Sequence, residues 1–369
     1  MNQSMLVRVF LHYGDVMNKV MCVVIRFLGD LICGFQIVLD ISYQGEAPHV
    51  SVTGKLPANP YIIGFERIWS STYQSRCGSV RIHATKSKSV NIAALNQELY
   101  DKSNDLRCLF NAWLKSDDFS RITNCLNKLD SSSEIRIIIS SNCQELRKLP
   151  WHLWDALTKF SRAEVALSVP DAELGSRVKG EKARILIVLG DSTNINVEAD
   201  KLLLMKYCSG AEIVLLNEPS RLELIHHLHD ELGWDFLFYS GHSLTIGAVG
   251  QIWINKNDNL SIGDLKDALQ FAIQKRLQLA IFNSCDGLGI ASELEKLNIS
   301  QVIVMRELIP DMVAQEFLKC FLIEFTSGNS LYISVKKARE RLLLLEDTFP
   351  CASWLPVIVQ HQLETSPTW

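Results

Sequence analysis

The sequence predicts an α/β protein built on a mostly parallel β-sheet. From about residue 134 onward, short apolar runs alternate with amphipathic segments, and this alternation is typical of strand–helix–strand units. Several runs, such as 184–189 (RILIVL), are almost continuously apolar, as expected for strands that are buried on both faces of a parallel sheet. The chain has 369 residues, which suggests either two domains or one large domain with an extension. We therefore expect an N-terminal extension over 1–133 and an α/β domain over 134–365.

The extension begins with a predicted β-hairpin over about 19–43. Its strands are 20–28 and 35–41, with Gly29 and Asp30 near the turn. The segment 56–60 (LPANP) ends this unit. Helical periodicity then predicts helices between about 61 and 129, at 61–73, 91–114 and 122–129, with an exposed loop over 75–89. Residues 1–16 fit no element, and Met17 is a candidate translation start.

The elements of the α/β domain are predicted from strand and helix periodicity in the same way. In chain order, we expect strands at 134–139, 164–169, 184–189, 212–216, 234–239, 277–282, 301–305 and 354–359, and helices at 151–160, 199–207, 220–232, 262–275, 291–297, 311–325 and 331–345. Ser220 is a predicted helix N-cap and Gly328 a predicted helix stop.

Composition excludes several classes of protein. The net charge is −4 with a pI near 6.2, so there is no basic signal for nucleic acid. Charged residues interrupt the apolar region 17–43, which argues against a membrane span, and no signal-peptide pattern appears. The ten cysteines are scattered without zinc spacing, which fits reduced thiols in a cytoplasmic protein. No phosphate-binding loop is found, and we expect no cofactor.

Two of the predicted strands end at a reactive side chain. The run 234–239 leads into Ser240-Gly241-His242-Ser243, and the run 277–282 leads into residues 283–287 (NSCDG) with Cys285 at the centre. Parallel strands that end at the same sheet edge would bring His242 and Cys285 together. A cysteine nucleophile needs such a base, because most of a thiol is protonated at neutral pH.

Neighbouring residues suit the same chemistry. Gly241 and Ser284 are small and leave room for a substrate backbone, and Gly287 permits a tight turn. The amides of Ser243 and Cys285 are candidates for an oxyanion hole. Taken alone, a cysteine after a strand is more often a core residue, and a histidine more often a satisfied loop residue. The two together favour a shared catalytic site.

Three other groups of polar residues each have two possible roles. Arg306 follows a strand near the same sheet edge and either binds a substrate or forms a structural salt bridge. Asp286 either lines a pocket for a basic side chain or accepts from a loop amide. The histidines at 226, 227 and 229 lie on the polar face of a helix, where a solvated role is favoured over a metal site, so we expect no metal.

The two motifs resemble those of bacterial CHAT-domain proteins, which are caspase-like cysteine peptidases. The segment 149–154 (LPWHLW) is similar to the opening of such domains, 302–306 with Pro310-Asp311 to the region after the catalytic cysteine, and 352–354 to the closing segment. This resemblance covers about 135–360 and implies a caspase-like three-layer α/β/α domain. It also implies that His242 is the general base, Cys285 the nucleophile, and the Ser243 and Cys285 amides the oxyanion donors. Ser243 replaces the glycine that caspases have there.

The sequence therefore favours a cysteine endopeptidase with a role in signalling or regulation, acting on a protein or peptide substrate. The extension would serve for regulation or for a protein partner. The alternative is a module of the same fold that binds a peptide without cutting it. A third hypothesis, an acyl-thioester enzyme of another kind, has no cofactor motif to support it.

Overall fold

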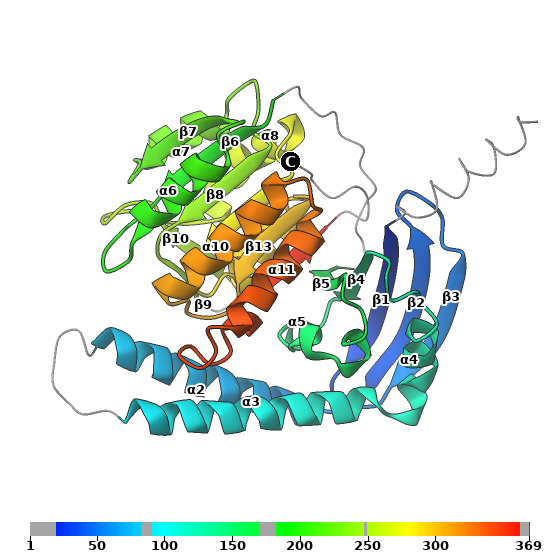
Figure 1. The fold of residues 1–369 in the computed structure, drawn as a ribbon. Coiled ribbons are helices and arrows are strands. Elements are labelled where there is room, and N and C mark those ends of the chain that lie inside the picture. The colour runs from blue at the N-terminus through cyan, green and yellow to red at the C-terminus, as the bar shows by residue number, and fades with distance from the viewer. Residues whose placement is uncertain (1–19, 83–90, 170–181, 247–248, 362–368) are drawn as a thin grey trace, which may run out of the picture.

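Figure 1 shows the fold in a computed structural model, which describes residues 20–82, 91–169, 182–246, 249–361 and 369. Within these ranges most strands join one 11-stranded sheet. Its strand order is β3 (Val50–Leu56), β2 (Gly34–Tyr43), β1 (Met21–Asp30), β4 (Ile135–Ser141), β5 (Ala163–Ser168), β14 (Pro356–Gln360), β13 (Gln301–Met305), β12 (Leu279–Asn283), β8 (Phe236–Ser240), β6 (Arg184–Leu189) and β7 (Glu212–Asn217). Between β4 and β7 only the β13–β14 pair is antiparallel. The predicted mostly parallel α/β fold is confirmed.

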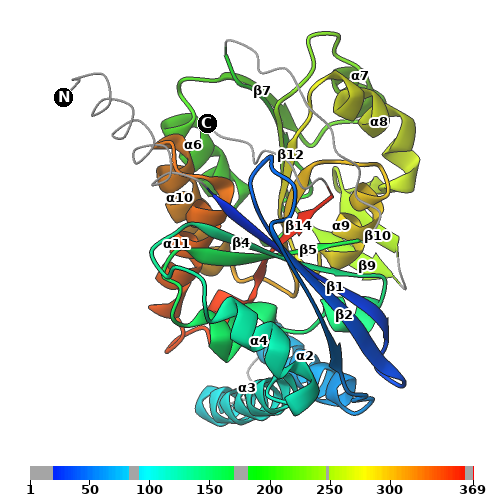
Figure 2. The same cartoon turned by 90° about the vertical axis from the view of Figure 1, so that its right-hand side faces the viewer.

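Helices cover both faces of the parallel part of the sheet. The helices α6 (Val197–Tyr207), α10 (Asp311–Thr326) and α11 (Leu331–Leu343) lie on one face, and α7 (Arg221–Leu228), α8 (Lys266–Lys275) and α9 (Leu288–Glu295) lie on the other (Figures 1 and 2). This arrangement is the expected three-layer architecture. Ser220 caps α7 as predicted, since its side chain accepts from the Glu223 amide at 3.2 Å. Gly328 follows α10 with φ +93°, a conformation that suits glycine.

The N-terminal hairpin belongs to the same sheet as the α/β domain. The strand β1 pairs in parallel with β4 from Met21↔Ile135 to Phe27↔Ser141. The Phe27 ring also packs against Trp151 of the domain, with ring centroids 5.1 Å apart. The strands on either side of the expected boundary at 133/134, β1 and β4, are therefore paired with each other and share one core.

After its strands, the extension continues with three helices, of which the two long ones form a pair. The helices α2 (Ile62–Ile82) and α3 (Ile92–Leu114) run side by side (Figure 1), followed by α4 (Ser120–Leu126). Trp69 of α2 stacks on Trp354 near the end of the domain at 5.0 Å between centroids. The extension is thus fastened to the domain by aromatic packing as well as by strand pairing.

Four sequence expectations differ from the structure. The helix predicted at 61–73 continues to Ile82, because α3 packs along it and Arg76 donates to the Asn96 side chain at 2.8 Å. The strand β3 was missed because its apolar residues are diluted by polar ones and Gly54. The helix predicted at 151–160 is two 3₁₀ turns, Trp151–Leu153 and Asp155–Leu157, with Trp154 in an extended conformation between them. A small sheet after His242 was also missed: β9 (Ser243–Ile246), β10 (Val249–Trp253) and β11 (Asn259–Ser261).

None of the helices in the described ranges combines the length and apolarity needed to cross a membrane. Residues 1–16 and the candidate start Met17 lie outside the described residues.

Candidate active site

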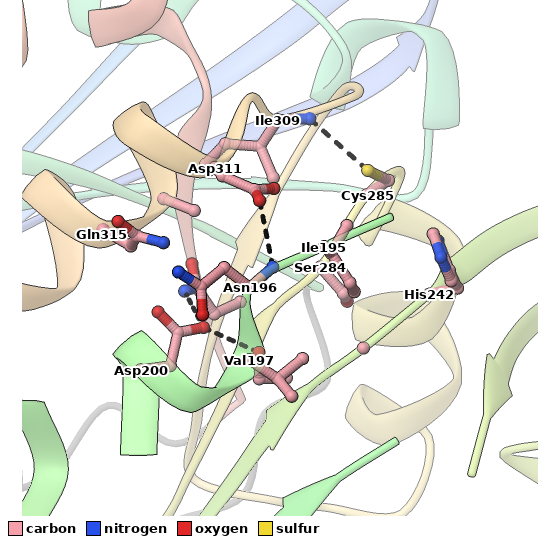
Figure 3. Close-up of a pocket in the computed structure, with 14 residues that line it drawn as sticks. Ile195, Asn196, Val197, Asp200, His242, Ser284, Cys285, Ile309, Asp311 and Gln315 are labelled. Carbon is pink, nitrogen blue, oxygen red and sulfur yellow. Dashed lines mark hydrogen bonds between the residues drawn. The ribbon is translucent and has the colours of Figure 1, made fainter. Parts of the chain in front are cut away.

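Strand register brings His242 and Cys285 to the same level of the sheet edge. The strands β8 and β12 pair in parallel, with Ser240 opposite Asn283. His242 stands two residues beyond Ser240, and Cys285 stands two residues beyond Asn283. Both line one pocket at the carboxyl ends of these strands (Figure 3). Ligand sites of parallel sheets are usually found at this edge.

The glycine before His242 is required by close packing. A Cβ at Gly241 would lie 2.6 Å from the Tyr239 hydroxyl oxygen and 3.1 Å from the Cα of Gly190. That hydroxyl is itself held by the carbonyls of His242 and Trp253, at 2.7 and 2.9 Å. Any side chain here would therefore push the His242 loop away from β6.

We expect Gly241→Ala to lower the free energy of unfolding by about 1–3 kcal/mol, the usual cost of overpacking. Gly210→Ala is the matched control, because a Cβ there meets nothing within 4 Å. Urea unfolding of both variants and the wild type measures the difference. Equal stabilities for the two variants would contradict the packing argument.

His242 is oriented by a backbone carbonyl. Its Nε2 atom lies 2.7 Å from the carbonyl oxygen of Thr193, in the loop between β6 and α6. A carbonyl only accepts hydrogen bonds, so Nε2 carries the proton. In the neutral ring the other nitrogen, Nδ1, is then the unprotonated one and can act as a base. The histidine thus has the third, orienting partner that activated nucleophile sites use.

Cys285 is 7% exposed and lies at the wall of the same pocket. Its Sγ atom accepts a hydrogen bond from the Ile309 amide at 3.5 Å (Figure 3). The loop after β13, which contains Ile309, therefore forms the side of the pocket that faces the thiol.

Ser243 ties the histidine loop to the cysteine loop. Its hydroxyl is 2.8 Å from the Ser284 hydroxyl and also contacts the Cys285 carbonyl oxygen. The Ser243 side chain is therefore buried between the two loops.

The turn after Cys285 is made by Asp286, not by Gly287 as the sequence suggested. Asp286 has φ +50°, in the left-handed region, and its carboxylate accepts from the Thr245 amide at 3.0 Å. Gly287 has an ordinary φ of −85°, but a Cβ there would lie 2.7 Å from the Val304 side chain. Of the two predicted roles of Asp286, the hydrogen bond to a loop amide is therefore present.

Asp286 and Arg306 do not line the Cys285 pocket. Both line a separate cavity on the α2 and α9 side of the sheet edge. Arg306 is 6% exposed and donates to the Lys148 carbonyl at 3.0 Å. Burial lowers the pKa of this guanidinium to about 10, with a further contribution from Arg339.

Sequence reasoning missed the acidic end of the Cys285 pocket. Asp200 of α6 is 4% exposed, and its Oδ2 atom accepts from Ser240 at 2.7 Å and from the Asn283 side chain at 2.9 Å. Asp311 also lines the pocket. Burial raises the pKa of Asp200 to about 6, and the Asp311 charge adds to this rise, against the two hydrogen bonds that lower it.

Two oxygens in this pocket lack donors. Within the described part of the chain, neither Asp200 Oδ1 nor Asn283 Oδ1 has a hydrogen-bond partner, although both are buried. A buried acceptor without a donor is unfavourable, so the pocket is suited to a ligand that brings N–H groups. The only sign of this in the sequence is a carboxylate, Asp200, in the helix after the strand 184–189. Helical periodicity alone does not distinguish such a residue from any other polar residue of a helix.

No group of three or more His, Cys, Asp or Glu side chains in the described ranges is arranged to hold a metal ion.

Comparison with known proteins identifies the fold. No protein-family model matches the chain, and the search of curated proteins gives no match. Among solved structures, the crystal structure of the Arg-specific cysteine proteinase gingipain R matches with a TM-score of 0.50 and 8% identity, over 68% of each chain. The complex of the pro- and mature domains of Porphyromonas gingivalis RgpB matches with a TM-score of 0.46 and 8% identity, over 72% of this chain and 70% of the other. The chain shares the caspase-like fold of the cysteine proteinase gingipain R.

Proposed function

We propose that this chain is a cysteine endopeptidase with Cys285 as nucleophile and His242 as general base. The observation that carries the proposal is the Thr193 carbonyl on His242 Nε2, beside the pocket that Cys285 lines. Nδ1 of His242 takes the thiol proton, and the thiolate attacks the peptide carbonyl carbon. The Thr193 carbonyl stabilises the imidazolium that forms.

The later steps use the same groups. The developing oxyanion is bound by the Ser243 and Cys285 amides. His242 then protonates the leaving amine, and a thioester to Cys285 remains. Water, deprotonated by His242, hydrolyses this thioester and restores the free thiol.

We extend the proposal to substrates with a basic side chain before the cleaved bond. Asp200 and Asp311 supply negative charge beside Cys285, and the free Oδ1 atoms of Asp200 and Asn283 would accept N–H groups from arginine or lysine. The structural neighbour gingipain R is itself described as Arg-specific.

From the CHAT resemblance we further propose that the chain acts in bacterial signalling or regulation. Asp286 and Arg306 line the neighbouring cavity and not the Cys285 pocket, so they would contact only a substrate that extends into that cavity. A regulatory protein partner would dock on the extension, where Phe65 and Ile68 of α2 and Tyr61 just before this helix are exposed.

Thiol labelling tests the proposal. We expect an arginyl chloromethyl ketone to form a single adduct with the wild type, no adduct with Cys285→Ala, and an adduct about 100-fold more slowly with His242→Ala, since a positioned base contributes 10²–10⁴-fold. Intact-mass spectrometry over time measures each rate.

Cys351→Ala is the control, because this buried thiol lies outside the Cys285 pocket. Labelling of Cys285 in the wild type and in Cys351→Ala no faster than that of the exposed Cys33 would overturn the catalytic proposal. The module that binds a peptide without cutting it would then be the better explanation.

A further inference from the structure

A second cavity lies next to the catalytic loops but apart from the Cys285 pocket. It has a volume of about 480 Å³, within the range of small-molecule sites. Its walls come from α2, α5 (Gln144–Arg147), α9 and the segments that follow β12 and β13. Neither His242 nor Cys285 lines it.

Cationic side chains outnumber acidic ones in this cavity. Five basic residues line it, against three acids. Two of the acids already have donors: Glu307 accepts from Ser70 and from Gln74 (2.5 and 2.8 Å), and Asp286 accepts from the Thr245 amide at 3.0 Å. The basic residues are Arg67, Arg147, Lys148, Lys296 and Arg306.

The two buried arginines keep unused hydrogen-bonding capacity beside the bond that each already makes: Arg147 donates to the Glu295 carboxylate at 2.7 Å, and Arg306 donates to the Lys148 carbonyl at 3.0 Å. Arg147 and Arg306 are 5% and 6% exposed, yet Arg147 Nη1 and Arg306 Nε have no acceptor among the described residues. The remaining three, Arg67, Lys148 and Lys296, are exposed and form no ion pair with any residue that the structure describes. Because a buried donor without an acceptor is costly, the cavity is complementary to a ligand rich in acceptors.

We propose that this cavity binds a small molecule carrying at least two phosphate or carboxylate groups, and that its occupancy alters the reactivity of Cys285. Guanidinium groups bind such anions through paired N–H···O bonds. Asp286 directly follows the nucleophile and Thr245 follows His242 by three residues, and both line the cavity. A bound anion would repel the Asp286 carboxylate and so act on both loops. The second part of the proposal concerns the site of the proposed function, whereas the binding itself is independent of it.

Thermal unfolding at constant ionic strength tests binding with two probes, inorganic pyrophosphate and citrate. We expect at least one to raise Tm with a saturable dependence on concentration. The dissociation constant of that probe should rise about tenfold or more in the double variant Lys148→Ala/Lys296→Ala. The response to each probe shows whether phosphate or carboxylate is preferred.

The matched control is Lys55→Ala/Lys266→Ala, which removes two exposed lysines outside the cavity and should leave the affinity unchanged. All four lysines are exposed, so loss of folding is not expected. If neither probe gave a saturable rise in Tm, the proposed binding site would be wrong. It would also be wrong if the two double variants bound the probe with equally reduced affinity.

Alkylation of Cys285 by iodoacetamide tests the coupling. With the bound probe we expect the rate to change at least about twofold in the wild type, and to stay constant in Lys148→Ala/Lys296→Ala. Binding without any change in this rate would overturn the effect on Cys285. Neither readout needs peptidase turnover, so failure here is distinguishable from failure of the proposed function.

Discussion

Alanine in place of Cys285 is expected to lower kcat/KM for peptide hydrolysis by about 10⁴-fold or more, because it removes the thiol that forms the acyl intermediate. His242→Ala is expected to cost about 10²–10⁴-fold. The double variant should be no slower than Cys285→Ala alone, since residues that act as a unit are not additive. Fluorogenic peptides with arginine before the cleaved bond provide the measurement.

Cys208→Ala is the matched control for this experiment. Cys208 is a buried thiol at the end of α6, and burial raises its pKa to about 12, so it cannot serve as a nucleophile. It should keep wild-type turnover. Residual hydrolysis in Cys285→Ala at the level of this control would mean that the thiol is not the nucleophile.

Strand patterns predicted the elements that position His242 and Cys285. The runs 234–239 and 277–282 are apolar at nearly every position, so both the strands and their shared parallel sheet could be expected from periodicity. The position of His242 and Cys285 at the ends of these strands then followed from the general behaviour of parallel sheets. The register Ser240↔Asn283 places the two motifs level with one another.

The groups that complete the site could not be predicted in the same way. Thr193 acts through a backbone carbonyl, which every residue has, so no residue type marks it. Asp200 stands 40 residues from Ser240 and 83 from Asn283 in sequence, and only the packing of α6 on the strand ends brings them together. The join between β1 and β4 likewise depends on pairing across more than 100 residues, which local periodicity does not encode.

Asp200→Asn is expected to lower kcat/KM for peptides with arginine before the cleaved bond by about 100-fold, within the 2–5 kcal/mol typical of losing one partner of a buried charge pair. Peptides with a neutral side chain there should be affected far less. In the wild type the ratio of turnover of arginine peptides to that of neutral peptides should fall as pH drops through about 6, because burial raises the pKa of Asp200 to that value and the carboxyl becomes neutral below it. Protonation of His242 affects both kinds of peptide alike, so in Asp200→Asn this ratio should not change with pH. Equal losses for both kinds of peptide would contradict the assignment.

The same substitution should have the opposite effect on stability. The pKa of Asp200 is about 6 in the folded chain and 3.8 in the reference state. The folded chain is therefore favoured when this carboxyl is protonated, and that contribution to the free energy of unfolding is lost as pH rises from about 4 through 6. Asp200→Asn should therefore be nearly neutral at pH 4 and stabilising by up to about 3 kcal/mol at pH 8, as measured by urea unfolding. Replacing a residue that served only the fold would instead lower the free energy of unfolding of the protein. A variant that is more stable and yet less active towards arginine would identify Asp200 as a group held at a cost to folding for the sake of substrate recognition.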